Sequence, residues 1–169
     1  MIKIRIHGIA DGRHEIDISV PAAEIDEIYP EYIGDVRLTG TLRKIGNRFS
    51  FVGEAACTAL LTCDRTLKKF EQLVTAEIKA SYLADTVQYR DGDEEVDEFE
   101  DNIIHEDQEF IDLTVEVREQ LAVAMPMKKI APDVEDKELE EIYPDYAAGN
   151  KKDSMPDDRW EALKKLKSN

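Results

Sequence analysis

A short cationic stretch with apolar neighbours is the part of the sequence best suited to bind another molecule. It contains Arg65, Lys68 and Lys69, beside Leu67 and Phe70. A guanidinium group with ammonium groups nearby can hold a phosphate or a carboxylate. The sequence therefore predicts a binding patch here, able to meet RNA although the chain as a whole is acidic.

The arginine of this patch also has a purely structural interpretation. Arg65 can pair with Asp64 or with another acid and so fix the turn in which it lies. Asp64 can in turn accept a hydrogen bond from the backbone two residues further on. The sequence leaves both interpretations of Arg65 open.

Motifs of known enzyme classes are missing from the sequence. It has no glycine-rich phosphate loop, no His-Glu-x-x-His, no Gly-x-Ser-x-Gly and no cysteine paired with a histidine by a local signature. His7, His14 and His105 are scattered, as ordinary surface or strand histidines are. Abundant carboxylates without a predicted pocket select no general acid or base. We therefore predict a protein that is not an enzyme and binds no cofactor.

The two cysteines, Cys57 and Cys63, lie six residues apart in a region that is predicted to be extended. At roughly 3.3 Å per residue they share a face but sit about 20 Å apart, too far for one metal ion or a disulfide. We expect two reduced, largely buried thiols and no metal site.

The charge balance restricts the class of partner. The chain of 169 residues has 22 Lys and Arg against 38 Asp and Glu, a net charge of -16. This excess argues against a general phosphate-binding surface, which needs many cationic side chains. The surface either only keeps the protein soluble or attracts a basic protein partner. No apolar run of about 18 residues or signal peptide is present, which predicts a cytoplasmic protein without a membrane span.

Alternating apolar residues predict a sheet built of five or six antiparallel strands. Residues 52–61 and 74–82 form two strands joined by a turn at residues 63–66, with a bulge at Gly53. Residues 36–43 form another strand, followed by a tight turn at Gly46-Asn47 and a strand with Phe49 and Phe51. This last strand continues through the bulge at Gly53 into the long strand that ends near Cys63. Ile2, Ile4 and Ile6, then Ile16, Ile18 and Val20, indicate a hairpin or adjacent strands. Such a sheet closes into a small barrel or packs helices on one face.

Three further segments interrupt the strands. Residues 21–29 predict a short helix that Pro30 stops. Residues 91–107 hold ten acidic residues in 17 positions. They predict a solvated, disordered loop or a decoy for basic protein segments. Residues 113–125 predict a helix that Asp112 or Thr114 caps and Pro126 ends, with a core stripe of Leu113, Val117, Leu121 and Met125.

The C-terminal region differs in character from the rest. Residues 154–166 predict a short helix with a serine cap and with Trp160, Leu163 and Leu166 along one side. Residues 24–32 and 138–146 match at six of nine positions around a shared Ile-Tyr-Pro. Either both are short acidic helices stopped by Tyr-Pro, or the two copies occupy the same kind of groove.

Three motifs in order resemble the YceD family of large ribosomal RNA subunit accumulation proteins. The first is Gly53, then Cys63, Arg65, Leu67 and Phe70. The second runs from Asp112-Leu113-Thr114 to Met127-Lys128, and the third from Asp158-Arg159-Trp160 to Leu166. The family usually has Cys-x-Arg-Cys at the turn and further cysteines after the second motif. Here Thr66 stands at that turn and residues 131–150 contain no cysteine, so any zinc site of relatives is lost.

The resemblance implies a non-enzymatic factor in large ribosomal subunit assembly or ribosomal RNA accumulation. It would bind large-subunit ribosomal RNA or a basic ribosomal protein, with contacts from the patch around Arg65 and from Arg159 and Trp160. The rivals are an acidic interaction module for a basic partner unrelated to ribosomes, and an enzyme acting on RNA.

These observations combine into an α+β fold with an antiparallel, barrel-like sheet, a packed helix and a C-terminal helical tail. We expect one domain over residues 1–130 and the tail over residues 131–169, and the sequence leaves the oligomeric state open.

Overall fold

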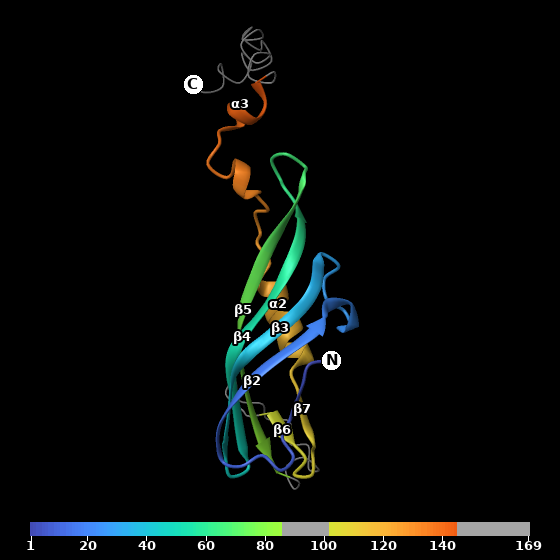
Figure 1. The fold of residues 1–169 in the computed structure, drawn as a ribbon, viewed down its shortest axis with the longest axis vertical. Coiled ribbons are helices and arrows are strands. Elements are labelled where there is room, and N and C mark those ends of the chain that lie inside the picture. The colour runs from blue at the N-terminus through green and yellow to red at the C-terminus, as the bar shows by residue number, and fades with distance from the viewer. Residues whose placement is uncertain (86–101, 145–169) are drawn as a thin grey trace, which may run out of the picture.

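The computed structural model describes residues 1–85 and 102–144, which are mostly strand with one longer helix, α2 (Thr114–Ala124) (Figure 1). The strands are β1 (Lys3–Arg5), β2 (Gly12–Pro21), β3 (Tyr32–Ile45), β4 (Arg48–Thr62), β5 (Lys69–Ala84), β6 (Asn102–Ile104) and β7 (Phe110–Asp112). The short helical turns are η1 (Ala22–Glu24), η2 (Pro132–Val134) and α3 (Leu139–Ile142).

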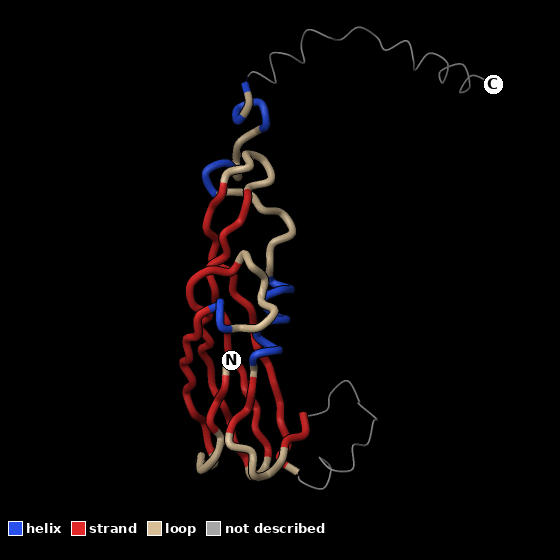
Figure 2. The backbone as a smooth tube through the Cα atoms, turned by 90° about the vertical axis from the view of Figure 1, so that its right-hand side faces the viewer, coloured by secondary structure: helices blue, strands red, loops and turns tan. Residues whose placement is uncertain are grey.

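The main sheet has five strands in the order β2-β3-β4-β5-β6, and it does not close into a barrel. The antiparallel, barrel-like prediction is therefore wrong in two respects. β6 pairs with β5 in parallel, and β2 and β6 remain at the two edges without pairing to each other. The predicted alternative holds instead, because α2 lies against one face of the open sheet and contacts β4 and β5 (Figure 2).

The first strand has a partner that the sequence did not indicate. β1 pairs with β7, from Lys3 opposite Asp112 to Arg5 opposite Phe110, whereas a hairpin or neighbouring position with the second strand was expected. β2 pairs with β3 over its full length. The apolar side chains of β1 and β7 join the same core as the sheet and α2, so the two small strands extend the cover of its inner face.

The predicted alternation of buried and exposed positions is confirmed. Along β5, Val74, Ala76, Ile78 and Tyr82 are buried and Ala80 packs against the core, whereas Thr75, Glu77 and Lys79 face solvent. The same period buries Ile2, Ile4 and Ile6, and the helical stripe buries Leu113, Val117 and Leu121. Burial of each large apolar side chain stabilises the fold by about 1.5–3 kcal/mol. The sum over these residues determines which face of the sheet is turned to the core.

Gly53 does not lie in a bulge, as predicted, but directly opposite Gly40 in regular pairing. The irregularity between β3 and β4 falls instead between Ile33 and Arg37. A Cβ atom at Gly53 would lie 2.3 Å from the carbonyl oxygen of Thr39 and 2.8 Å from Cζ of Phe51. The two glycines are therefore required by close approach of the two backbones and of the buried Phe51 ring.

The predicted helix over residues 21–29 is only the single turn η1. Glu27 has φ 59°, a left-handed conformation that cannot continue a right-handed helix. The turn at Gly46-Asn47 is confirmed between β3 and β4, and Gly46 supplies its positive φ of 59°.

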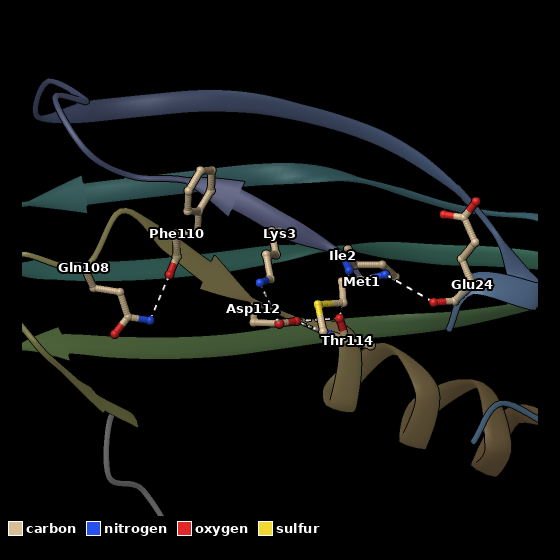
Figure 3. Close-up of polar contacts among 8 residues, drawn as sticks. All are labelled: Met1, Ile2, Lys3, Glu24, Gln108, Phe110, Asp112 and Thr114. Carbon is tan, nitrogen blue, oxygen red and sulfur yellow. Dashed lines mark hydrogen bonds and ion pairs between the residues drawn. The ribbon is translucent and has the colours of Figure 1, made fainter. Parts of the chain in front are cut away.

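The helix α2 begins and ends where the sequence indicated, with a different arrangement at its start. Leu113 is the N-cap residue, and the Asp112 carboxylate accepts a 3.0 Å hydrogen bond from the backbone N–H of Thr114. The Thr114 hydroxyl accepts from the N–H of Ile2 at 2.8 Å, and Lys3 lies beside Asp112 (Figure 3). These contacts tie the first residues of the chain to the start of the helix.

The acidic stretch 91–107 falls partly outside the described residues. Its end differs from the predicted loop, because residues 102–104 form β6 and Ile104 is buried. The two isoleucines of this segment supply the apolar surface that a solvated loop lacks.

Candidate interaction site at the hairpin tip

The predicted binding patch lies at the tip of the β4–β5 hairpin, which projects beyond the other strands (Figure 1). The N–H of Leu67 donates to the carbonyl of Cys63, and the N–H of Cys63 donates to the carbonyl of Lys68, both at 2.8 Å. Leu67 closes this turn with φ 58°, a conformation that costs roughly 1–2 kcal/mol for a residue with a side chain. Its side chain is nevertheless 77% exposed.

The chain beyond α2 returns along this tip, and we name residues 129–143 the strap. The N–H of Asp64 donates to the carbonyl of Lys129 at 2.7 Å, and the N–H of Lys129 donates to the Asp64 carboxylate at 2.8 Å. Asp64 therefore bonds the strap, whereas the sequence suggested a bond within its own turn.

Arg65 is occupied by the strap, in a way that neither sequence interpretation described. Its Nη1 donates to three backbone carbonyls, those of Val134 at 2.9 Å, Glu135 at 3.2 Å and Lys137 at 2.6 Å. Helix ends leave such carbonyls unpaired and favour cations, so the guanidinium caps η2. The Tyr143 hydroxyl also donates to the Arg65 carbonyl at 2.8 Å. Arg65 thus positions the strap, and within residues 1–85 and 102–144 it has no acidic partner.

The other patch residues divide between surface and core. Lys68, Lys69 and Leu67 are exposed at the tip. Phe70 is half-buried and packs against both the main core and a small cluster of Cys63, Ala131 and Val134. The tip therefore presents two ammonium groups and one apolar side chain to solvent, above a buried aromatic support. Arg159 and Trp160 lie outside the described residues, as does the predicted helix that contains them.

Both cysteines are free and buried, as predicted. The Cys63 Sγ accepts a hydrogen bond from the Ala131 N–H at 3.4 Å. This bond, followed by the Thr66 hydroxyl and the N–H groups of Thr66 and Arg65, lowers the pKa of Cys63 to about 7 against the opposing effect of burial. Burial raises the pKa of Cys57.

The surroundings of Cys63 do not fit a zinc ion. The apolar side chains of its cluster belong to Ala131, Val134, Phe70, Ile130 and Ile142, and the polar side chain that bonds its sulfur is the Thr66 hydroxyl. None of these is a usual zinc ligand. In residues 1–85 and 102–144, no group of three or more His, Cys, Asp or Glu side chains could hold a metal. Apolar packing and backbone hydrogen bonds hold the turn together in place of metal coordination.

The three histidines are not gathered into a site. His14 Nε2 lies 2.8 Å from the carbonyl oxygen of Ala10, and His105 Nδ1 accepts from the Asp107 N–H at 3.2 Å. Neither contact joins a histidine to a nucleophile.

A second polar feature was missed at the sequence level, at the opposite end of the sheet near the β3–β4 turn. Arg13 on β2 and Arg43 on β3 are direct cross-strand neighbours. A depression of about 330 Å³ beside them is lined by Arg43, Ile45, Ser50 and Ser81, among others. The alternation of the strands could have placed each of these side chains on the outer face, but only the register brings them together.

Fold and tip together define a β-rich protein with one helix and exposed cationic and apolar side chains at a hairpin tip. The chain matches the family model described as large ribosomal RNA subunit accumulation protein YceD over residues 51–167. This match spans more than half of the sequence, and the protein belongs to the YceD family. Membership implies a role in the accumulation of large-subunit ribosomal RNA, in a family of accumulation factors that are not known as enzymes.

No curated protein and no solved structure matches the chain. Among the helices of the described ranges, 1–85 and 102–144, none has the length and apolar character needed to cross a membrane.

Proposed function

We propose that this protein is a non-enzymatic, cytoplasmic factor that supports accumulation of large-subunit ribosomal RNA by binding that RNA or a basic ribosomal protein. The family match over residues 51–167 carries the proposal, since it includes the whole β4–β5 hairpin tip. The net charge of -16 supports it further, because an acidic surface attracts basic partners over a distance of about 10 Å.

The contact surface in this proposal is the hairpin tip. Lys68 and Lys69 supply charge for a phosphate or carboxylate, and Leu67 supplies an exposed apolar contact. Arg65 holds the strap against the tip and so acts as a positioning residue. Arg159 and Trp160 provide a second contact in the tail, residues 131–169, which extends from a domain of residues 1–130.

A second candidate is an acidic interaction module for a basic partner unrelated to ribosomes. The charge balance of 22 basic against 38 acidic residues favours it equally, because charge attracts any basic protein. The two candidates differ in whether large-subunit components accompany the protein.

A tagged pull-down at low and moderate salt separates them, scored for large-subunit RNA and proteins. We expect enrichment with the native protein and loss in the Lys68→Ala, Lys69→Ala variant. Lys79→Ala is the matched control, because Lys79 is an exposed lysine on the same strand that pairs with Glu77 at 2.8 Å. Recovery of a basic partner without ribosomal components would favour the second candidate.

A further inference from the structure

One row of side chains crosses the outer face of the sheet at the end away from the hairpin tip. Its members are cross-strand neighbours in the order Arg13, Arg43, Ser50 and Ser81. Along its strand, each of these residues is next to a residue that points to the inner face, such as His14, Leu42 or Phe49. The side chains of the row therefore point to the outer face, towards solvent. Arg13 and Arg43 are exposed, and the serines are half-buried.

The two arginines are unpaired in an otherwise acidic protein. Like charges directly opposite each other destabilise a sheet. In the part of the chain that the structure describes, neither guanidinium makes a hydrogen bond or an ion pair. Arg37, on the same face and the same strand as Arg43, differs, because it binds both carboxylate oxygens of Asp17 at 3.0 and 2.7 Å. An anionic ligand would relieve the repulsion between Arg13 and Arg43.

The depression beside this pair has the size and lining of a small binding site. Its volume of about 330 Å³ is at the lower end of ligand pockets, which span roughly 300–1,000 Å³. Arg43 and the hydroxyls of Ser50 and Ser81 give it hydrogen-bond donors, while Ile45, 58% exposed, gives it an apolar wall. This lining suits a nucleotide, because the donors can bind its anionic phosphate and the apolar wall can contact its uncharged sugar or base.

We propose that this arginine groove, formed by Arg13, Arg43, Ile45, Ser50 and Ser81, binds phosphate groups of single-stranded RNA. The proposal rests on the proposed function, for which it names a further contact surface in addition to the hairpin tip and the tail. Planar guanidinium groups bind phosphate through paired hydrogen bonds, and serine hydroxyls are common phosphate donors. Because the rest of the protein is acidic, the contact is confined to one or two phosphates.

Fluorescence anisotropy of a labelled single-stranded oligoribonucleotide with the full-length protein tests the groove. We expect Arg13→Gln with Arg43→Gln to weaken binding about tenfold or more, the usual effect of losing charge-assisted hydrogen bonds. The slope of log affinity against log salt should fall by about 1.4, corresponding to two phosphates of a single strand. Arg37→Gln is the matched control and should change the affinity less than about twofold, since surface pairs contribute little.

The proposal that the groove binds RNA would be refuted by unchanged affinity in the double variant. It would also be refuted if the native protein did not bind RNA. Unlabelled RNA should compete more strongly than a nucleoside monophosphate or inorganic phosphate. Equal competition would show that the groove binds small phosphate compounds and does not prefer RNA. Circular dichroism of both variants should match that of the native protein, as expected when exposed side chains are replaced without loss of the sheet.

The outcomes also separate this inference from the proposed function. If the double variant binds the labelled oligoribonucleotide as tightly as the native protein does, while the pull-down still recovers large-subunit RNA, the groove proposal fails and the proposed function stands. If RNA binding needs the two arginines but depletion of the protein in cells leaves large-subunit RNA levels unchanged, the groove stands and the proposed function fails.

Discussion

At the scale of single residues, Cys63 has the most distinctive chemistry. Its folded pKa of about 7, against an ordinary value of 9.0, reflects hydrogen bonds to the thiolate from Ala131, Thr66 and Arg65. A lowered pKa means that folding favours the deprotonated form. The contribution of this group to stability is therefore fully present above pH 9, decreases as the pH falls towards 7, and is absent below that.

We predict that the free energy of unfolding of the native protein contains a component that rises between pH 7 and pH 9 and is missing in Cys63→Ala. Urea unfolding at both pH values measures it. Thr66→Val removes the hydroxyl donor and should raise the midpoint of the thiolate absorbance titration. An equal pH response in native protein and Cys63→Ala would show that Cys63 gains no stabilisation as a thiolate.

Side-chain exposure was more predictable from sequence than side-chain partners. Lys68 and Lys69 are exposed, as the predicted binding patch requires. The partners of Arg65 could not be inferred, because they are carbonyls 69 to 72 residues further on, and carbonyls carry no sequence signature. Likewise, only the strand register makes Arg43 a neighbour of Arg13.

At the scale of elements, the strap depends on one side chain of the hairpin. Arg65→Ala should loosen residues 134–137 and lower the free energy of unfolding by about 1–2 kcal/mol, as charged hydrogen bonds are lost. Arg65→Lys should restore little, because the lysine Nζ lies one bond closer to the backbone than Nη1, the atom that donates to all three carbonyls. Amide hydrogen exchange measures the protection of the strap.

Arg118→Ala provides the matched control for this experiment. Arg118 pairs with Glu27 at 2.6 Å, away from the strap, so exchange in residues 134–137 should remain native. Strap protection that is equal in Arg65→Ala and Arg118→Ala would remove Arg65 from its positioning role.

The centre of the sheet depends on the glycine pair of β3 and β4. Gly53→Ala should lower the free energy of unfolding by about 3 kcal/mol, since its Cβ meets the backbone at 2.3 Å and the Phe51 ring at 2.8 Å. Gly46→Ala is a control with nothing within 4 Å of its Cβ and a positive φ, and should cost only about 1 kcal/mol. Chemical unfolding of the two variants compares them, and equal losses would contradict the close-packing account.

Long strands and their pairing were more predictable than short strands and their partners, for a physical reason. Alternation over ten to 16 residues identifies β2, β3, β4 and β5, because one buried face constrains every second position. β6 and β7 have three residues each, too few to show a period. The alternation of Ile2, Ile4 and Ile6 did indicate β1, but its partner is chosen by tertiary packing. The parallel pairing of β6 is what the barrel-like prediction could not anticipate.

At the scale of the whole molecule, two basic surfaces lie at opposite ends of an acidic protein. Ser50 of the arginine groove lies near the start of β4 and the hairpin tip follows Thr62 at its end, so about 12 residues of strand separate the two surfaces, roughly 40 Å (Figure 1). This distance is several Debye lengths at physiological salt, where one is about 8 Å. Charge changes at one end therefore do not alter the field at the other.

We predict that the two ends contribute independently to binding of large-subunit particles. Sites this far apart add in free energy to within about 0.5 kcal/mol. The variant that combines Lys68→Ala and Lys69→Ala with Arg13→Gln and Arg43→Gln should therefore weaken binding by the product of the two separate fold-changes. Co-sedimentation at several salt concentrations measures all three variants against the native protein. The contrary result is a combined variant that binds the particle with the same affinity as whichever of the two double variants binds less tightly. That result would mean that only one end of the molecule contacts the particle.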